Sequence, residues 1–252
     1  MKGRPLVAAA LLGALCAGCG GDGRADERGR GAGTITVFAA ASLTEAFTQI
    51  ARDLEDDAPG TTVVLSFGAS STLAQQIVNG APADVFAAAS PATMATVVDA
   101  GDAGPPQVFA RNSLQIAVPA DGPDVTLTDF ADDALTIALC APQVPCGAAA
   151  AQALAAAGVT PRPDTLEQDV KAALSKVRLG EVDAALVYRT DVLSAGDAVR
   201  GIDLPEAAEV VNDYPIATLV GSRNGDAAAA FVDRVLSAEG QRVLADAGFV
   251  RP

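Results

Sequence analysis

Short apolar runs alternate with stretches of helical periodicity along most of the chain. Short apolar runs bounded by turn residues predict buried strands, and apolar residues recurring every three or four positions predict helices. Strands or extended segments are predicted over residues 34–40, 61–67, 84–89, 107–119, 136–139, 182–187 and 212–221. Helices are predicted over residues 42–56, 73–78, 91 onward, 148–157 and 166–179, with two more within 226–247. This alternation is typical of an α/β domain with a largely parallel sheet.

Helix start signals accompany three of these helices. Ser42 and Glu45 match a Ser-x-x-Glu capping box, and Thr72 and Gln75 offer a second capping pair. Pro91 stands at a first helical position, where its missing N–H is not needed. We therefore expect the side chains of Ser42 and Thr72 to cap their helices.

The two longest extended segments, residues 107–119 and 212–221, indicate that the chain crosses twice between two lobes. The predicted lobes comprise residues 34–111 with 217–252, and residues 112–216. Half of all residues are hydrophobic, which is enough to build a core in each lobe. The chain shows no fixed-period repeat that would suggest an array instead.

The first residues have the pattern of an export signal. Basic residues precede an apolar run over residues 6–15, which is too short to span a bilayer. Two small residues stand directly before Cys19, as in bacterial lipoprotein signals. We expect residues 1–18 to be a signal peptide and Cys19 to carry lipid at the outer face of the membrane, with a plain secretory signal as the alternative. Residues 19–33 are rich in glycine and charge, which predicts a flexible tether.

The charge balance restricts the possible partners. The formal net charge is −14, and it falls to −16 for a chain that begins at Cys19, because Lys2 and Arg4 are lost. Nucleic acid and anionic membrane surfaces are therefore disfavoured partners. An anion site in such a chain has to use neutral hydrogen-bond donors instead of a basic patch.

The sequence contains no histidine. This excludes a Ser-His-Asp or Cys-His nucleophile system, and it excludes histidine-based zinc or iron sites. Asp84, Asp169 and Asp183 could pair for acid–base chemistry in an exported enzyme, but each stands beside a predicted helix start or strand. Capping or solvation explains them there. We therefore expect a protein that is not an enzyme and holds no cofactor.

Two cysteines remain once Cys16 of the signal peptide and the lipid-bearing Cys19 are set aside. Cys140 and Cys146 enclose the five residues APQVP. Disulfides persist in exported proteins, so we expect a bridge between them, with two buried free thiols as the alternative.

The turns between predicted strands and helices are the candidate ligand-binding segments. Each turn places free backbone N–H groups and the positive end of a helix dipole at the carboxyl edge of a sheet, which is a site for an anion. The four turns that carry this pattern are Ala40-Ala41-Ser42, Gly68-Ala69-Ser70-Ser71, Pro145-Cys146-Gly147 and Gln168-Asp169-Val170. Two of them come from each predicted lobe.

Several segments, in this order and spacing, resemble the molybdate-binding proteins of ABC-type uptake systems. They are VFAAASLTEAF, FGASSTLAQQI, GAPADVFAAAS, PQVPCG, EQDVKAAL, GEVDAALVY and the terminal AGFV. The resemblance implies a two-lobed α/β fold of the type II periplasmic-binding-protein class, with a mixed, mostly parallel sheet in each lobe and a ligand cleft between the lobes. It also implies a membrane permease as partner, a monomer, and molybdate or tungstate as ligand.

The family's ligand contacts fall on five residues when they are matched motif by motif. The resemblance implies hydroxyl donors at Ser42, Ser70 and Tyr188, and backbone N–H donors at Cys146 and Val170. Relatives can have alanine where Cys146 stands, which is compatible with a contact through the backbone. The only metal expected at these residues is the one inside the oxyanion.

Other readings stay open at this point. A receptor for sulfate, phosphate or another solute could share the fold, and so could a sensor without a transport partner. Ferric iron is disfavoured, because such sites commonly pair tyrosines with histidine and only Tyr188 and Tyr214 are present. Amino-acid and sugar receptors would be expected to show stacking aromatics, yet aromatic residues are only 4% of the chain.

Overall fold

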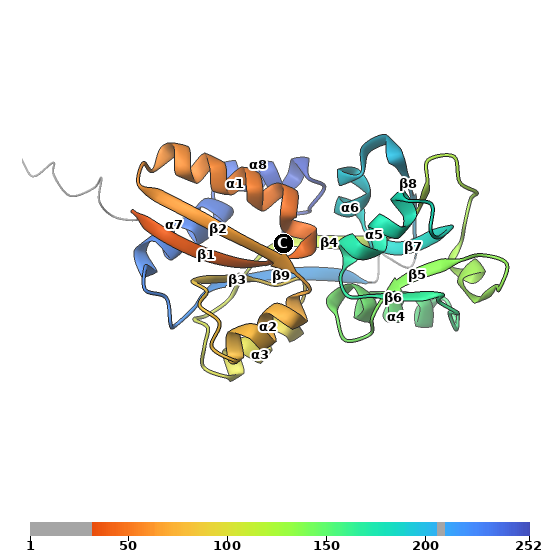
Figure 1. Cartoon of the computed structure of the whole chain (residues 1–252), viewed down its shortest axis with the longest axis horizontal. Coiled ribbons are helices and arrows are strands. Elements are labelled where there is room, and N and C mark those ends of the chain that lie inside the picture. The colour runs from red at the N-terminus through yellow and green to blue at the C-terminus, as the bar shows by residue number, and fades with distance from the viewer. Residues whose placement is uncertain (1–31, 206–209) are drawn as a thin grey trace, which may run out of the picture.

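The computed structural model describes residues 32–205 and 210–252, which form two lobes side by side (Figure 1). The predicted signal peptide, the lipid site at Cys19 and the predicted tether up to residue 31 lie outside the described residues. Among the helices of the described part, none is both long enough and apolar enough to cross a membrane.

The first lobe is built on a five-stranded portion of the sheet in the order β2-β1-β3-β9-β4. Its strands are β1 (Gly33–Ala40), β2 (Thr61–Gly68), β3 (Val85–Ala87), β4 (Gln107–Pro119) and β9 (Val211–Thr218). Strand β1 pairs in parallel with β2 and β3, whereas β9 runs antiparallel to β3 and β4. Parallel neighbours need a crossover connection, and the helices that follow β1 and β2 supply it.

Helices cover both faces of this sheet (Figure 1). They are α1 (Thr44–Asp57), α7 (Gly225–Leu236) and α8 (Ala238–Asp246) on one face, and α2 (Ser70–Val78) and α3 (Pro91–Asp99) on the other. Successive strand side chains point to opposite faces, so Val37 packs with Phe47 and Phe231 on one side, while Phe38 packs with Leu73 on the other. This burial on two faces explains why the strands appear in the sequence as continuous apolar runs.

The second lobe continues the sheet in the order β4-β7-β5-β6, with β8 paired to β4. Its further strands are β5 (Ile137–Cys140), β6 (Thr165–Glu167), β7 (Ala184–Tyr188) and β8 (Val199–Asp203). Its helices are α4 (Pro145–Ala156), α5 (Val170–Arg178) and α6 (Arg189–Ser194). Short 3-10 helices are η1 (Ala41–Leu43) in the first lobe and η2 (Leu127–Ala131) and η3 (Gly196–Ala198) in the second.

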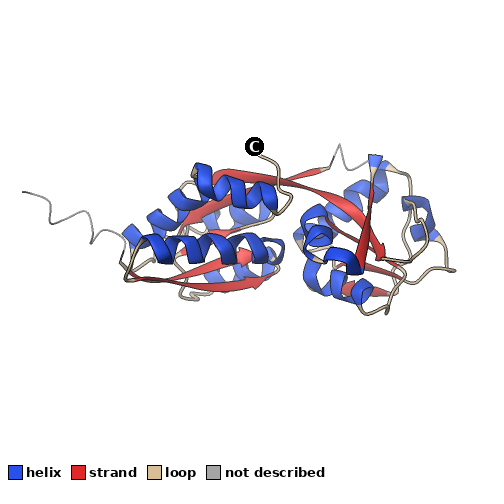
Figure 2. Ribbon diagram, turned by 90° about the horizontal axis from the view of Figure 1, so that it is seen from above, coloured by secondary structure: helices blue, strands red, loops and turns tan. Residues whose placement is uncertain are grey.

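Strand β4 belongs to both lobes (Figure 2). Residues 107–113 pair with β9, and residues 114–119 pair with β7 and β8. This arrangement confirms the two-lobed α/β fold expected from the sequence, and β4 has the predicted bounds, residues 107–119. The lobe boundaries themselves stay a prediction.

The two lobes touch each other at the strand-to-helix turns. Ala41 and Ala69 belong to the first lobe, yet both are buried in the apolar cluster of the second lobe. The small side chains at these two positions allow the turns of one lobe to approach the other closely. The structure is therefore a closed arrangement of the lobes.

The prediction of one helix over residues 166–179 is wrong at its start. Residues 165–167 form β6, which pairs in parallel with β5, and the helix begins only at Val170. Leu166 matches the apolar spacing of a helix, but its side chain is exposed on the edge strand β6. No pattern in the sequence predicts β8, or α6, which is only six residues long.

The start of α4 is tightly constrained. A disulfide joins Cys140, at the end of β5, to Cys146, in the first turn of the helix, with their Cα atoms 5.8 Å apart. Gly147 follows, and a Cβ atom at this position would lie 2.0 Å from the backbone oxygen of Ala141. Only glycine therefore allows the loop between the cysteines to fold against the helix.

We expect Gly147→Ala to lower the free energy of unfolding by about 2 kcal/mol or more, because the added methyl group collides with backbone that cannot yield. Gly225→Ala is the matched control, because Gly225 also lies in the first turn of a helix and a Cβ there meets no atom. Its effect should stay within about 0.5 kcal/mol. Urea unfolding of both variants measures the difference, and equal effects would contradict the assigned contact.

Candidate functional site

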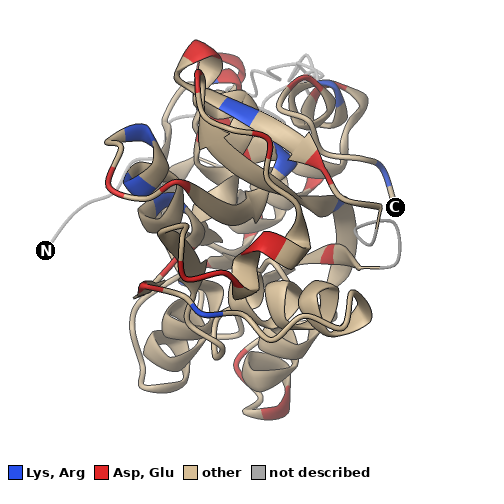
Figure 3. Cartoon of the chain, turned by 90° about the vertical axis from the view of Figure 1, so that its right-hand side faces the viewer, with Lys and Arg blue, Asp and Glu red and all other residues tan. Residues whose placement is uncertain are grey.

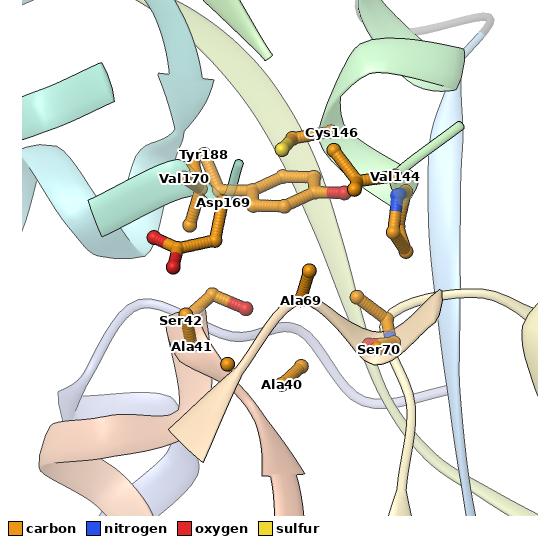
Figure 4. A pocket seen from close by; sticks show the side chains of 13 residues that line it. Ala40, Ala41, Ser42, Ala69, Ser70, Val144, Cys146, Asp169, Val170 and Tyr188 are labelled. Carbon is orange, nitrogen blue, oxygen red and sulfur yellow. The ribbon is translucent and has the colours of Figure 1, made fainter. Parts of the chain in front are cut away.

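A pocket lies where the two lobes meet (Figure 4). It contains about 230 Å³ of empty space, its open mouth included. Its walls are Ala40, Ala41, Ser42, Gly68, Ala69, Ser70, Ala89, Val144, Pro145, Cys146, Asp169, Val170 and Tyr188. All five residues that the sequence nominated for ligand contact therefore lie in one pocket, together with residues of all four predicted turns.

Four helical segments of the described chain begin at this pocket: η1, α2, α4 and α5. The N–H groups in the first turn of a helix have no acceptor within the helix. The residues that precede η1, α2 and α4 are Ala40, Ala69 and Val144, and none of them caps its helix with a side chain. The pocket thus collects uncapped N–H groups and the positive ends of helix dipoles from both lobes.

Helices α2 and α4 start three residues earlier than the sequence predicted, which brings two of the nominated residues into first helical turns. Helix α2 begins at Ser70 instead of residue 73, and α4 begins at Pro145 instead of residue 148. Ser70 and Cys146 therefore lie within first helical turns. Thr72, predicted to cap α2, instead lies inside the helix.

Ser42 also does not cap a helix, contrary to the prediction of a capping box. It lies within η1, and its hydroxyl oxygen is 2.9 Å from the phenolic oxygen of Tyr214. Helix α1 begins after it at Thr44, without a side-chain cap. The long-range contact holds Ser42 in the pocket wall, and the Glu45 carboxylate binds Lys171 of the second lobe instead.

The hydroxyl groups of Ser70 and Tyr188 are both available as hydrogen-bond donors. Ser70 Oγ accepts a hydrogen bond from the N–H of Ala89 at 3.0 Å, so its own proton is free to point elsewhere. Tyr188 is buried, and this burial raises the pKa of its phenol well above the usual value. Both groups are therefore protonated donors at neutral pH. Ala89, which the sequence did not nominate, contributes through its N–H in the turn after β3.

Charge around the pocket is sparse. No Lys or Arg is among its described wall residues, and Asp169 is the acidic one. The Asp169 carboxylate accepts a hydrogen bond from the N–H of Ala172 at 2.9 Å, so it caps α5. Elsewhere, acidic and basic residues are distributed over helices, strands and loops (Figure 3).

A cluster of ionisable residues centred on Lys171 of α5 lies next to the pocket. Lys171 Nζ lies 2.8 Å from Glu45 Oε1 of the first lobe and 3.4 Å from Asp191 Oδ1 of the second. Asp191 is completely buried, and its Oδ1 lacks a hydrogen bond. Burial raises the pKa of Asp191 to about 7, although Lys171 and the N–H of Tyr188 oppose this shift. The cluster holds α5 and α1 together across the two lobes.

The fold and this pocket define a two-lobed binding protein with a site for a small anion between its lobes. The model of the bacterial extracellular solute-binding protein family matches residues 35–250, and the chain belongs to this family. Membership places it among extracytoplasmic binding proteins of transport systems and argues against the exported enzyme.

Individual relatives agree with this assignment. The chain is 42% identical to the molybdate-binding protein ModA of Mycobacterium tuberculosis, over 98% of this chain and 97% of the relative. This similarity confirms the resemblance inferred from the sequence motifs.

Solved structures show the same fold. The periplasmic molybdate-binding protein of Azotobacter vinelandii superposes with a TM-score of 0.75 at 24% identity, covering 86% of this chain and 99% of that one. The sulfate-binding protein SubI of M. tuberculosis superposes with a TM-score of 0.71 at 18% identity, covering 86% of each chain. Since proteins named for different anions share the fold, the fold alone does not identify the anion.

We expect Asp169→Asn to lower the Kd for a fully ionised oxyanion about three- to tenfold at low ionic strength, because a repelling charge at the wall is removed. Asparagine caps helices as well as aspartate does, so α5 should be retained. Asp226→Asn is the control, since it removes the same charge from the first turn of α7, outside the pocket. Titration calorimetry at two salt concentrations measures the effect. Unchanged or weaker binding by the Asp169 variant would contradict a repulsive effect of this carboxylate on the ligand.

We expect the free energy of unfolding to fall as the pH rises from 5 to 7, by on the order of 1 kcal/mol per pH unit. The folded protein keeps Asp191 protonated up to about pH 7, whereas the unfolded chain ionises it near its ordinary value of 3.8. The chain has no histidine that would add its own slope in this range.

Chemical denaturation at several pH values measures this slope in the wild type and in Asp191→Asn. The variant should lose most of the slope. An unchanged slope in the variant, or a flat wild-type profile, would show that Lys171 keeps Asp191 ionised instead.

Proposed function

We propose that this chain binds molybdate, with tungstate as an equivalent ligand, in the pocket between its lobes and delivers it to the permease of an ABC transporter. The observation that carries this proposal is the convergence of helix N-termini and hydroxyl donors from both lobes on a pocket without a basic side chain. The 42% identity to a protein named for molybdate binding supports the choice of anion.

The donor set fits a tetrahedral dianion. Hydroxyls of Ser42, Ser70 and Tyr188 and backbone N–H groups of Cys146 and Val170 would each donate to an anionic oxygen. Hydrogen bonds to a charged acceptor contribute about 1.5–3 kcal/mol each, more than those between neutral groups. The helix dipoles supply partial positive charge, so no full countercharge has to be buried.

Size would decide between anions in this arrangement. Molybdate and tungstate have longer metal–oxygen bonds than the sulfur–oxygen bonds of sulfate. A smaller anion cannot reach donors on both lobes at once, and each buried donor left without an acceptor costs about 1–3 kcal/mol. This reasoning favours molybdate over sulfate and leaves molybdate and tungstate equivalent.

Access requires the lobes to separate, because the hydroxyl-bearing residues of the pocket are nearly inaccessible in the closed arrangement. The strands β4 and β9 connect the lobes and are the natural hinge. We further propose a monomer without a resident cofactor, anchored at the outer face of the membrane by lipid on Cys19. The signal pattern that ends in Cys19 supports the anchor.

Titration calorimetry with molybdate, tungstate, sulfate and phosphate tests the proposal directly. Molybdate and tungstate should bind with similar Kd values and more tightly than the other two anions. Tighter binding of sulfate or phosphate would identify a receptor for that anion, which is the second candidate function. Absence of binding for all four would overturn the oxyanion site.

Val170→Pro extends this test to a single backbone donor, because proline lacks the N–H yet is tolerated at the first position of a helix. Asp169 has the extended backbone, with φ −155° and ψ 174°, that a residue before proline requires. We expect the Kd for molybdate to rise about 10- to 100-fold.

Val170→Ala is the matched control, since it also shortens the side chain but keeps the N–H. Its Kd should stay near that of the wild type. Equal weakening by both substitutions would show that Val170 acts through its side chain.

A further inference from the structure

The return strand β9 places two polar side chains beneath the pocket without lining it. Asn212 and Tyr214 are two residues apart on β9, and residues with this spacing lie on the same face of a strand. Tyr214 is completely buried, and a buried tyrosine hydroxyl usually has a hydrogen-bond partner. Each of the two side chains contacts a hydroxyl that lines the pocket.

Tyr214 determines the direction of the Ser42 hydroxyl. Asn112 Oδ1 accepts the N–H of Ser113, so the amide nitrogen of Asn112 faces the other way. That nitrogen donates to Thr190 Oγ1 at 2.9 Å and to the Tyr214 hydroxyl at 3.4 Å. One lone pair of the Tyr214 oxygen is thus occupied, and its own proton is available to Ser42 Oγ, 2.9 Å away, which would leave the Ser42 proton free for the pocket.

Asn212 contacts the hydroxyl of Tyr188, which lies on the opposite wall of the pocket. Its amide nitrogen donates to the Tyr188 hydroxyl at 3.1 Å and to the carbonyl oxygen of Ala89 at 2.9 Å. Both of its N–H groups are used, one toward each lobe. The Tyr188 oxygen thus accepts a hydrogen bond from the protein, which leaves its proton available for donation.

Figure 4 shows Ser42 and Tyr188 on opposite walls of the pocket. Neither hydroxyl is limited by chemistry to the role of donor, because a free hydroxyl rotates and can accept as well. An accepting hydroxyl would turn a lone pair toward the anion and repel it. The contacts from β9 occupy one lone pair of each hydroxyl oxygen before a ligand arrives, which disfavours this alternative and is the preorganisation that favours binding.

We propose that Tyr214 and Asn212 are positioning residues that fix Ser42 and Tyr188 as hydrogen-bond donors to the bound oxyanion. This inference rests on the proposed oxyanion site. Neither residue touches the ligand, and each acts through the hydroxyl that it contacts. Since both stand on the strand that connects the lobes, the donors are aligned on both walls by a single element.

A double-mutant cycle tests the role of Tyr214, with molybdate affinity measured by titration calorimetry at fixed salt. Tyr214→Phe keeps the aromatic ring and removes only the hydroxyl. We expect it to raise the Kd about tenfold in the wild-type background and less than about twofold in a Ser42→Ala background, where the hydroxyl to be oriented is gone. In a Ser70→Ala background the tenfold effect should persist, because Ala89 orients Ser70.

Equal effects of Tyr214→Phe in the wild-type and Ser42→Ala backgrounds would overturn the role of Tyr214, because a merely structural residue acts independently of Ser42. A second cycle pairs Asn212→Ala with Tyr188→Phe and keeps the proposal testable if one variant is unstable. Wild-type protein that binds none of the four anions would refute the proposed function itself. Wild-type protein that binds molybdate with additive cycles would refute only the positioning role.

Discussion

A buried backbone N–H needs an acceptor, and this requirement explains most of the arrangement between the lobes. Three helical segments begin at the pocket without a side-chain cap, following Ala40, Ala69 and Val144. Left alone in a closed cleft, their first N–H groups would each carry a desolvation cost. An anion with several acceptor oxygens satisfies all of them at once. The lack of caps is therefore a feature of a binding site, where an ordinary fold would have used Ser or Asp.

The same constraint reconciles an acidic chain with an anionic ligand. A formal charge of −14 repels anions at long range, but helix N-termini and hydroxyls act at contact distance and add no charge to the interior. Asp169 in the pocket wall caps α5, and the neighbouring Lys171 pairs with Glu45 of the first lobe and lies 3.4 Å from Asp191 of the second. Charge at this interface therefore serves to hold the lobes together, and the donors serve the ligand.

The fold and the wall of the pocket were largely predictable from the sequence, because both follow from local pattern. The apolar run of β4 predicted its bounds to the residue, and the turns after strands marked the segments that contain Ser42, Ser70, Cys146 and Val170. The resemblance to molybdate-binding proteins singled out these four residues and added Tyr188. What the sequence missed depends on contacts between distant residues. Ser42 matches a capping box but bonds to Tyr214, 172 positions away, and residues 165–167 join β5 as an edge strand instead of extending a helix.

Strands β4 and β9 run between the lobes, and their position explains why these distant contacts lie beside the pocket. Strand β4 is hydrogen-bonded in both lobes, because it pairs with β9 at one end and with β7 and β8 at the other. Side chains on such strands are among the few that can reach both walls of the cleft. In the closed arrangement Asn212 makes one hydrogen bond to each lobe. In the proposed positioning role, alignment of the donors is therefore linked to the closed arrangement of the lobes.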